Sequence, residues 1–398
     1  ARYYDGSDPA LYSFRSAWAT WPSPPAAPAQ AGAAPPAAPS AAGAPAAPAA
    51  PTAPTAPTAS ARVDAAPAPI ALGTLLDYYR DPARTLCEAV FGLRLDALRG
   101  DRLRESEPLE PATEALDRVA ARVFLEQAGR GERAAPAQAP EWLRLAGVLP
   151  PGRPGEQAWA VEADKVDAMF AIVAAPTCPA HALFAQALPP AQAVAVEQVL
   201  GAYVLRGELQ DVREDAIARW RLCVRPGKKE DELGFADRIG AFIGWALLRL
   251  ATPPPRAVRL ALLAAPGKDA ASAWSVQWNA WDEHYLAAAG VAQAQLRADL
   301  ERRLLALVEF FVAAEAEPLA YLPKTSWTAL EGDAAAIVKT WAGTDHATGE
   351  SQYAPGYARL LAGTHDLGEA ALQARLRANA HTLRALIQPA SAAQAAAP

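Results

Sequence analysis

The sequence has few of the residues that build the commonest functional sites. It contains three cysteines and five histidines in 398 residues, and no cysteine pair has the spacing of a zinc or redox site. A sparse, odd number of cysteines is typical of a reducing compartment, so we predict a cytoplasmic protein. No apolar run reaches the ~18 residues of a membrane-spanning helix, and we therefore predict no membrane contact.

Basic charge is also in short supply. The formal net charge is −6, whereas a protein that binds nucleic acid on its own usually carries a basic surplus. Any DNA contact must therefore come from local groups of arginine, or partner chains must supply the affinity. The sequence likewise has no P-loop, no G-x-G-x-x-G turn and no G-x-S-x-G elbow, which excludes the usual nucleotide-binding and serine-hydrolase sites.

Composition divides the chain into four parts. Residues 22–69 are almost entirely alanine and proline, and such a segment has too little large apolar surface to offset the entropy of ordering. We predict a disordered linker there and a disordered tail at 390–398. The six aromatic side chains of residues 1–21 predict a segment that docks on a folded surface. Residues 70–389 should form the folded domain.

The periodicity of apolar residues predicts an α/β domain in this range. Helical spacing starts at Leu72, and Asp81-Pro82 should end that helix and begin the next one, with Asp81 as the N-cap. At 203–224 the period becomes two, which predicts two apolar strands joined by a short charged turn. The apolar helix that we predict at 235–250 should pack on the sheet that these strands start.

Two further predictions concern the second half of the chain. The apolar run at 258–264 predicts a third strand, and 276–281 reads as its hairpin partner. Residues 318–327 read as a loop between helices, with Leu319, Tyr321 and Trp327 turned inward.

The two strands at 203–224 have the arrangement that frames the metal site of one class of nucleases. Such a site needs an Asp on one strand and (Asp/Glu)-x-Lys on the next, because the carboxylates hold the metal and the lysine orients the attacking water. Here Gln210 stands in the Asp place, and Trp220 and Arg221 stand in the ligand places of the second strand. A neutral amide and a guanidinium do not attract a divalent cation. We therefore predict vacant catalytic positions and no bound metal.

Two alternatives stay open on the residues alone. Asp211 lies one residue from the expected ligand place, which on an alternating strand points to the opposite face. An active nuclease with a displaced metal site near Asp211, Asp215 or Glu230 is one alternative. An α/β interaction module without any DNA role is the other.

Arginines gather around the same strands. A groove that guides a single strand of nucleic acid needs cations for the phosphates and aromatic rings for base stacking, whereas ordinary surface charge needs neither. If these arginines belong to a groove that guides a nucleic-acid strand, the DNA-contact candidates are Arg206, Arg219, Trp220, Arg221 and Arg225.

Short stretches spread along the chain match one protein family in its own order. They are Ser13-Phe14-Arg15, residues 72–84, Glu107-Pro108-Leu109, residues 144–150, Gly155-Glu156 with Trp159, the Gly207 strand with Arg219-Trp220-Arg221, residues 318–323 and Trp327. In these stretches the chain resembles the gamma subunit of bacterial exodeoxyribonuclease V (RecC), in its C-terminal region.

This resemblance implies a restriction-endonuclease-like (PD-(D/E)xK nuclease-like) core with extra helices that is catalytically inactive. It implies a non-catalytic, DNA-guiding scaffold subunit of an ATP-dependent helicase-nuclease that acts in double-strand break repair by homologous recombination. The implied partners are the helicase-nuclease beta subunit, the helicase alpha subunit, and DNA as a duplex end and as single strands. Residues 1–21 would dock to an upstream helicase-like part. This chain would bind no cofactor, and ATP and Mg²⁺ would act in the other subunits.

Overall fold

The computed structural model describes residues 67–92, 118–266, 274–314, 321–353, 356–357 and 367–389, all within one compact unit, Val63–Pro398. The segments predicted at 1–21 and 390–398, and the linker up to residue 66, lie outside the described residues. The described helices are α2 (Leu72–Arg80), α3 (Pro82–Phe91), α6 (Val119–Arg130), α7 (Glu141–Leu145), α8 (Arg153–Ala174), α9 (His181–Phe184), α10 (Phe235–Ala251), α11 (Trp274–Ala287), α12 (Val291–Ala313), α13 (Pro323–Ala329), α14 (Ala334–Ala342), α15 (Glu350–Tyr353) and α17 (Ala370–Leu386). The described strands are β1 (Ala68–Ala71), β2 (Gln192–Leu200), β3 (Tyr203–Glu214), β4 (Ala218–Lys229), β5 (Ala257–Ala265), β6 (Gly343–Thr344) and β7 (Ala347–Thr348).

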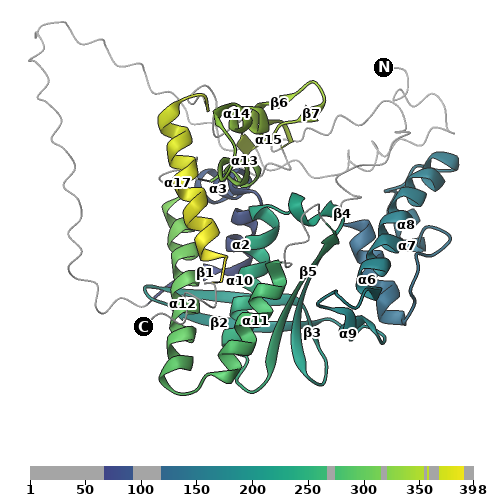
Figure 1. Cartoon of the computed structure of the whole chain (residues 1–398). Helices are drawn as coiled ribbons and strands as arrows, with labels where there is room; N and C mark the ends of the chain where they lie inside the picture. Colours follow the sequence, from purple (N-terminus) through teal and green to yellow (C-terminus); the bar gives the residue numbers. More distant parts are fainter. Residues whose placement is uncertain are drawn as a thin grey trace, which may run out of the picture. The chain divides into compact units, whose positions relative to one another are not determined.

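A five-stranded mixed sheet lies at the centre of the molecule (Figure 1). Its order is β1-β3-β4-β5, and β2 pairs with the other edge of β3. β1 is parallel to β3 and β5 is parallel to β4, whereas β2 and β4 run antiparallel to β3. The mixed α/β class is therefore confirmed, and the assignment to the restriction-endonuclease-like fold stays a prediction. β1 begins at Ala68, two residues before the predicted start of the folded part, because its backbone pairs with that of β3.

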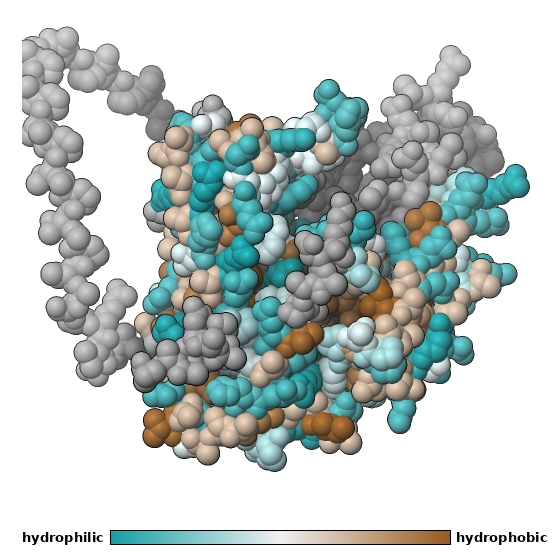
Figure 2. All heavy atoms as spheres, viewed as in Figure 1, coloured by the Kyte–Doolittle hydropathy of each residue, from teal (hydrophilic) through white to brown (hydrophobic). Residues whose placement is uncertain are grey.

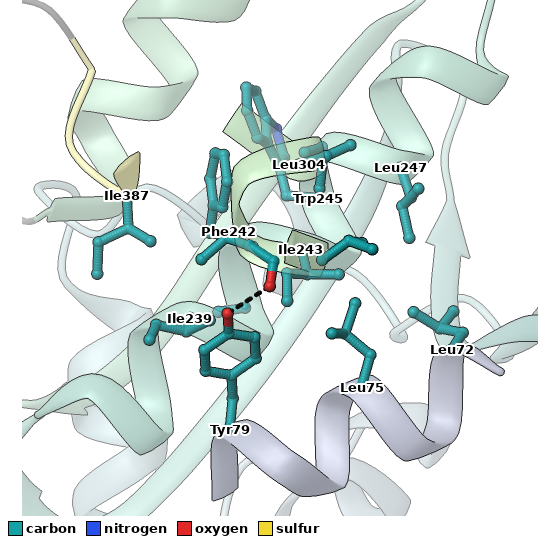
Figure 3. Packing of buried hydrophobic residues seen from close by; sticks show 14 of the residues in the cluster. Leu72, Leu75, Tyr79, Ile239, Phe242, Ile243, Trp245, Leu247, Leu304 and Ile387 are labelled. Atoms are coloured by element: carbon teal, nitrogen blue, oxygen red, sulfur yellow. Dashed lines mark hydrogen bonds between the residues drawn. The ribbon is translucent and has the colours of Figure 1, made fainter. Parts of the chain in front are cut away.

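One face of the sheet is covered by α10, with α2 and α12 packed around that helix. Figure 3 shows Leu75 of α2, Phe242 of α10 and Leu304 of α12 meeting in this core. The Tyr79 hydroxyl donates a hydrogen bond of 2.7 Å to the Leu307 carbonyl, which ties α2 to α12. α10 lies between the sheet and these helices, so nearly all of its side chains are buried, as expected for a helix that is apolar all round.

The opposite face of β4 and β5 is covered by α6 and α8, which lie to the right in Figure 1. Phe124 of α6 packs on Phe170 of α8 with ring centroids 4.8 Å apart. β4 alternates in burial, and its even-numbered residues Trp220 and Leu222 face this second core. β4 and β5 thus each contribute to two separate hydrophobic clusters, one on each side of the sheet.

The outer edge of β5 is covered by a helix, which corrects the hairpin predicted at 276–281. Asn279 of α11 accepts a hydrogen bond from the Leu260 N–H at 2.8 Å and donates one to the Leu260 carbonyl at 3.0 Å. Asp282, one turn further along, accepts from the Val258 N–H at 2.9 Å. These side chains satisfy the strand edge that a hairpin partner would otherwise pair with.

Other element boundaries agree with the sequence more closely. Asp81 caps α3 by accepting a hydrogen bond from the Arg84 N–H at 3.0 Å, and Pro82 is the first helical residue, as predicted. The loop predicted at 318–327 is wrong in its second half, because Pro323 begins α13. Proline is well suited to this position, since the first helical N–H has no intrahelical acceptor.

The surface offers no broad apolar area on the face that Figure 2 presents. Among the coloured atoms there, strongly hydrophobic residues form small separate spots between polar side chains. Across the described part of the chain, none of the helices combines the length and the apolar character needed to cross a membrane.

Candidate functional site

The strand β3 has an unpaired stretch at Gln210, one of the positions that the sequence predicts to be vacant in a nuclease site. β1 pairs with β3 at Tyr203–Arg206, and β4 pairs with the same edge of β3 at Val212–Glu214. Between them, residues 207–211 have no strand partner on that edge among the described strands. The sheet therefore opens at the predicted vacant position.

Helix α2 enters this opening because Gly207 has no side chain. A Cβ atom at Gly207 would lie 2.7 Å from the Cβ of Leu72, the first residue of α2. Gly207 also has a φ of +158°, at the border of the region that L-residues avoid. Glycine is thus required both for the backbone conformation and for the close approach of the helix.

A bulge at Gln210 and Asp211 interrupts the alternation of β3. Gln192 of β2 pairs with Val212 of β3, and Val194 pairs with Leu209. The two β2 residues are two positions apart and their β3 partners are three apart, so β3 has one extra residue here. Asp211 has a φ of 60°, and both bulge residues are exposed. The prediction that Asp211 lies on the opposite face assumed a regularly alternating strand. The bulge breaks this alternation, so that argument does not apply to Asp211.

The guanidinium of Arg221 lies in the opening beside Gln210. Its Nη1 donates a hydrogen bond to the Gln210 carbonyl. Its Nε lies next to Gly244 of α10, where a Cβ would come within 2.8 Å. Gly244 thus provides the room for a cation between the sheet and the helix. Of the three residues predicted at vacant positions, the structure brings Gln210 and Arg221 into contact, and the guanidinium places a positive charge there.

Three arginines of β4 lie in a row along α10. Arg219 donates to the Thr252 hydroxyl at the end of α10 at 3.4 Å and to Glu214 at 3.3 Å. Arg221 lies at the middle of the helix, beside Gly244. Arg225 reaches the first turn, where its Nε donates to Asp237 at 2.6 Å. Period two on β4 produces this row, because the odd-numbered residues share one face.

Trp220 lies on the other face of β4 and belongs to the core. Only 6% of its surface is exposed, and its indole N–H donates to Asp215 Oδ2 at 2.7 Å. The ring packs in the cluster under α6 and α8, so it does not present a face for base stacking. Proximity in sequence to Arg219 and Arg221 was misleading, because neighbours on a strand point to opposite sides.

Arg206 is separate from the row on α10. It lies on the exposed part of β3, with more than half of its side chain accessible, and pairs with Glu197 of β2 at 2.8 Å. The structure therefore places the five DNA-contact candidates in three environments: a row along α10, a buried core position and an exposed strand position.

Two of the three carboxylates considered for a displaced metal site, Asp215 and Glu230, are far apart and accept hydrogen bonds within the protein. Asp215 accepts hydrogen bonds at 2.7 Å from the N–H groups of Ile217 and Ala218, besides that from Trp220. Burial raises the pKa of Asp215, but these hydrogen bonds and the nearby Arg256 outweigh it and hold the pKa below its ordinary value. Glu230 follows the other end of β4, whose pairing with β5 runs from Ala218 and Ala257 to Lys229 and Ala265. Because this pairing spans eight residue steps of β5, Glu230 lies on the order of 25 Å from Asp215.

No group of three or more His, Cys, Asp or Glu side chains in the described residues has a geometry that could hold a metal ion. At the two predicted ligand places themselves, an amide and a guanidinium supply no anionic oxygen to a hard cation. Glu208 lies beside them and accepts a hydrogen bond from the Gln210 amide at 3.1 Å.

One charged group near this site carried no sequence signal. Asp237 in the first turn of α10 holds both Arg225 and Lys228, with Nζ of the lysine 3.2 Å from its Oδ2. The helical period places Asp237 on α10, but only the packing of α10 on β4 brings the two cations to it.

The fold and site define a mixed α/β protein in which an arginine occupies the opening of a central sheet. Residues 67–334, more than half of the chain, match the family of the RecC C-terminal domain, and the chain belongs to that family. No curated protein matches the chain. Membership in this family connects the chain with the RecBCD complex, exodeoxyribonuclease V, and with DNA repair.

Proposed function

We propose that this chain is a non-catalytic scaffold that guides DNA within a bacterial ATP-dependent helicase-nuclease of the exodeoxyribonuclease V type. In this role it acts in double-strand break repair by homologous recombination, in the cytoplasm. Its partners are the helicase-nuclease beta subunit, the helicase alpha subunit, and DNA as a duplex end and as single strands. The match to the RecC C-terminal domain family supports the complex, and the site geometry supports the non-catalytic role.

The observation that carries the non-catalytic role is the position of Arg221. Its guanidinium donates to the Gln210 carbonyl at the opening of the sheet, at the place where a nuclease of the predicted fold would hold its metal. A fixed positive charge there repels Mg²⁺, and the ion would lose its preferred carboxylate ligands. ATP and Mg²⁺ are accordingly proposed to act in the other subunits.

The guiding role relies on arginines that differ in accessibility. Arg206 keeps more than half of its side chain exposed, and Arg225 about a third. Arg219 and Arg221 are engaged within the protein through Glu214 and Gln210. We therefore assign direct phosphate contact to Arg206 and Arg225, and assign to Arg219 and Arg221 the support of the sheet.

The first prediction concerns cleavage by the full chain and by the complex reconstituted with both partner subunits. The full chain alone should not cut single-stranded or forked DNA with Mg²⁺ or Mn²⁺, because Arg221 lies at the Gln210 carbonyl and the described residues assemble no metal-binding group of three His, Cys, Asp or Glu side chains. In the complex, deleting residues 70–389 should abolish assembly or reduce processive unwinding by at least tenfold. Unwinding is measured with a fluorescent forked duplex, and assembly by size-exclusion chromatography.

Two outcomes contradict the proposal. Metal-dependent cleavage by the full chain that Asp211→Ala abolishes would establish an active nuclease with a displaced site. A complex that still assembles and unwinds normally after the deletion would show that the domain is no scaffold. Glu331→Gln, which also removes one exposed carboxylate, is the matched control for Asp211→Ala.

A further inference from the structure

Four cations from three parts of the chain lie near the first turn of α10. They come from the last turn of α2, the residue before α6, and the end of β4. Arg225 and Lys228 contact the nearly buried carboxylate of Asp237, and Arg80 lies close enough to interact with the charges of Asp237 and Arg118. We call this group the Asp237 cation cluster: Arg80, Arg118, Arg225 and Lys228. α2 packs directly against α10, which is what brings its last turn to this place.

The Asp237 cation cluster has more positive than negative charge. Asp237 is engaged by two of its cations, with Nε of Arg225 at 2.6 Å and Nζ of Lys228 at 3.2 Å. Arg80 lies 3.9 Å from Asp77, an exposed carboxylate, at the outer limit of an ion pair. Burial first, and then the charge of Arg118, lower the pKa of Arg80 below its ordinary value. Among the described residues that these interactions connect, four cations therefore face two carboxylates, and the cations repel one another.

This surplus distinguishes the cluster from other arginines of the chain. Arg249 is buried against Asp282 at 2.9 Å, with both side chains almost inaccessible. Arg302 and Arg303 share the carboxylate of Asp299 within a single helix. In the Asp237 cation cluster, by contrast, Arg80 and Lys228 keep about half of their side chains exposed, and Arg118 is exposed. Anionic groups from outside can therefore reach it.

We propose that the Asp237 cation cluster binds the phosphates of a nucleic-acid strand through its backbone, without reading bases. This proposal rests on the proposed function and assigns it a contact site that the sequence did not indicate, apart from Arg225. Guanidinium groups match the geometry of phosphate oxygens through paired N–H donors. A phosphate bound there would offset the repulsion among the four cations, so the ligand and the site stabilise each other.

The surroundings favour backbone contact over base contact. The aromatic residues nearest in the chain, Tyr78 and Tyr79, are 1% and 0% exposed and are packed in the core. Bases therefore find no exposed ring from these residues on which to stack, whereas stacking is the usual source of base contacts in single-strand sites. Binding at the cluster should be independent of sequence and strongly dependent on salt.

The test measures affinity for a fluorescent single strand by anisotropy across a salt series, using the full chain. The triple variant R80Q/R118Q/K228Q removes three cations from exposed positions. Each lost phosphate contact lowers the slope of log K against log salt by about 0.7 for single strands, so the slope should fall by about 2. Affinity at low salt should fall by about 10- to 100-fold. Arg225 is kept, because it anchors Asp237 within the fold.

A second variant tests the cluster in the opposite direction. Asp77→Asn removes the exposed carboxylate beside Arg80. Because this carboxylate repels a phosphate, its loss should tighten binding about two- to fivefold. A gain of affinity cannot arise from misfolding. The matched control is Arg302→Gln, which removes one exposed arginine of α12 and should leave affinity and slope unchanged.

The outcomes separate this inference from the proposed function. If the triple variant binds the strand with the affinity and slope of the unaltered chain, the inference is overturned, while crosslinks from forked DNA to other parts of the chain in the reconstituted complex would keep the guiding role. If the triple variant loses a partner subunit but binds DNA normally, the cluster is a protein contact and the inference is again overturned. If no DNA crosslinks to the chain at all, both proposals fail.

Discussion

At the scale of single residues, the glycines around the open part of β3 decide what the sheet can contain. Gly207 lets the first residue of α2 lie against the strand, and Gly244 leaves room on α10 for the Arg221 guanidinium. Neither requirement is visible in the sequence, since a strand glycine and a helix glycine ordinarily weaken their own elements. The cost is offset by the close approach that each glycine permits.

A prediction follows for Gly207→Ala. The added Cβ would lie 2.7 Å from the Cβ of Leu72, and the backbone would keep its φ of +158°. Overpacking and strain of this kind should lower the free energy of unfolding by about 2–4 kcal/mol, measured by urea denaturation. The control is Gly73→Ala in α2, where a Cβ would meet nothing within 4 Å. That control should change stability by no more than about 1 kcal/mol, and an equal loss in both variants would contradict the explanation.

At the scale of elements, short helices depend on side chains that come from elsewhere in the chain. α13 has only seven residues, and its first turn is held by Glu350 at the start of α15. This carboxylate accepts the Lys324 N–H at 3.0 Å, the Thr325 N–H at 2.7 Å and the Thr325 hydroxyl at 2.6 Å. A helix this short is marginal by itself, so the contact with Glu350 positions it.

The burial of Glu350 predicts a pH dependence of stability. Burial raises the pKa of Glu350 above its ordinary 4.5, although hydrogen bonds from Thr325 and Lys324 act in the opposite direction. Because the folded pKa is raised, the stability from this group is fully present below the unfolded pKa and is lost as pH rises through the folded pKa. The free energy of unfolding of the unaltered chain, minus that of Glu350→Gln, should therefore decrease as pH rises from about 4.5.

The measurement is urea denaturation at a series of pH values for both proteins. Glu331→Gln is the matched control, since Glu331 is 81% exposed and pairs with Arg384 at the surface. Its difference from the unaltered chain should stay nearly flat over the same range. A difference for Glu350→Gln that grows with pH would mean that hydrogen bonding, and not burial, dominates at this carboxylate.

At the scale of the whole molecule, the sheet joins the two hydrophobic cores. Trp220 and Cys223 of β4 face opposite clusters, as do Leu260 and Ala261 of β5. Neither face can lose its helices without exposing strands that the other face needs. The RecC C-terminal domain match spans residues 67–334 and so includes helices from both faces.

This shared sheet predicts a single cooperative unfolding transition. Phe124→Ala in the core under α6 and Leu304→Ala in the core around α10 should each lower the free energy of unfolding by about 3–5 kcal/mol. In both variants, circular dichroism and tryptophan fluorescence should report the same midpoint. Leu145→Ala, at a side chain that is 80% exposed, should change the midpoint little. An early, separate loss of helix signal in Phe124→Ala would show that the two faces unfold independently.

Some features of the fold were predictable because their causes are local. The Asp81-Pro82 helix start depends on a cap three residues from its donor. The two strands of 203–224 show their own period, and the apolar composition of 235–250 predicts a helix buried on all sides. The hairpin predicted at 276–281 was wrong because alternation over six residues is too short to decide. Aromatics at Trp274, Trp278 and Tyr285 have the helical spacing that would have corrected it.

The sequence by itself determined the residue types at the candidate site: a glutamine, a tryptophan and an arginine where a nuclease needs carboxylates and a lysine. Only the tertiary structure decided what each of them does. It placed Trp220 in the core, directed Arg221 to the Gln210 carbonyl, and brought Arg225 and Lys228 of β4 to Asp237, near Arg80 of α2. The physical reason is that charge and secondary-structure propensity are properties of a single residue. The direction of a side chain and the identity of its partner depend on contacts between elements that are distant in the chain.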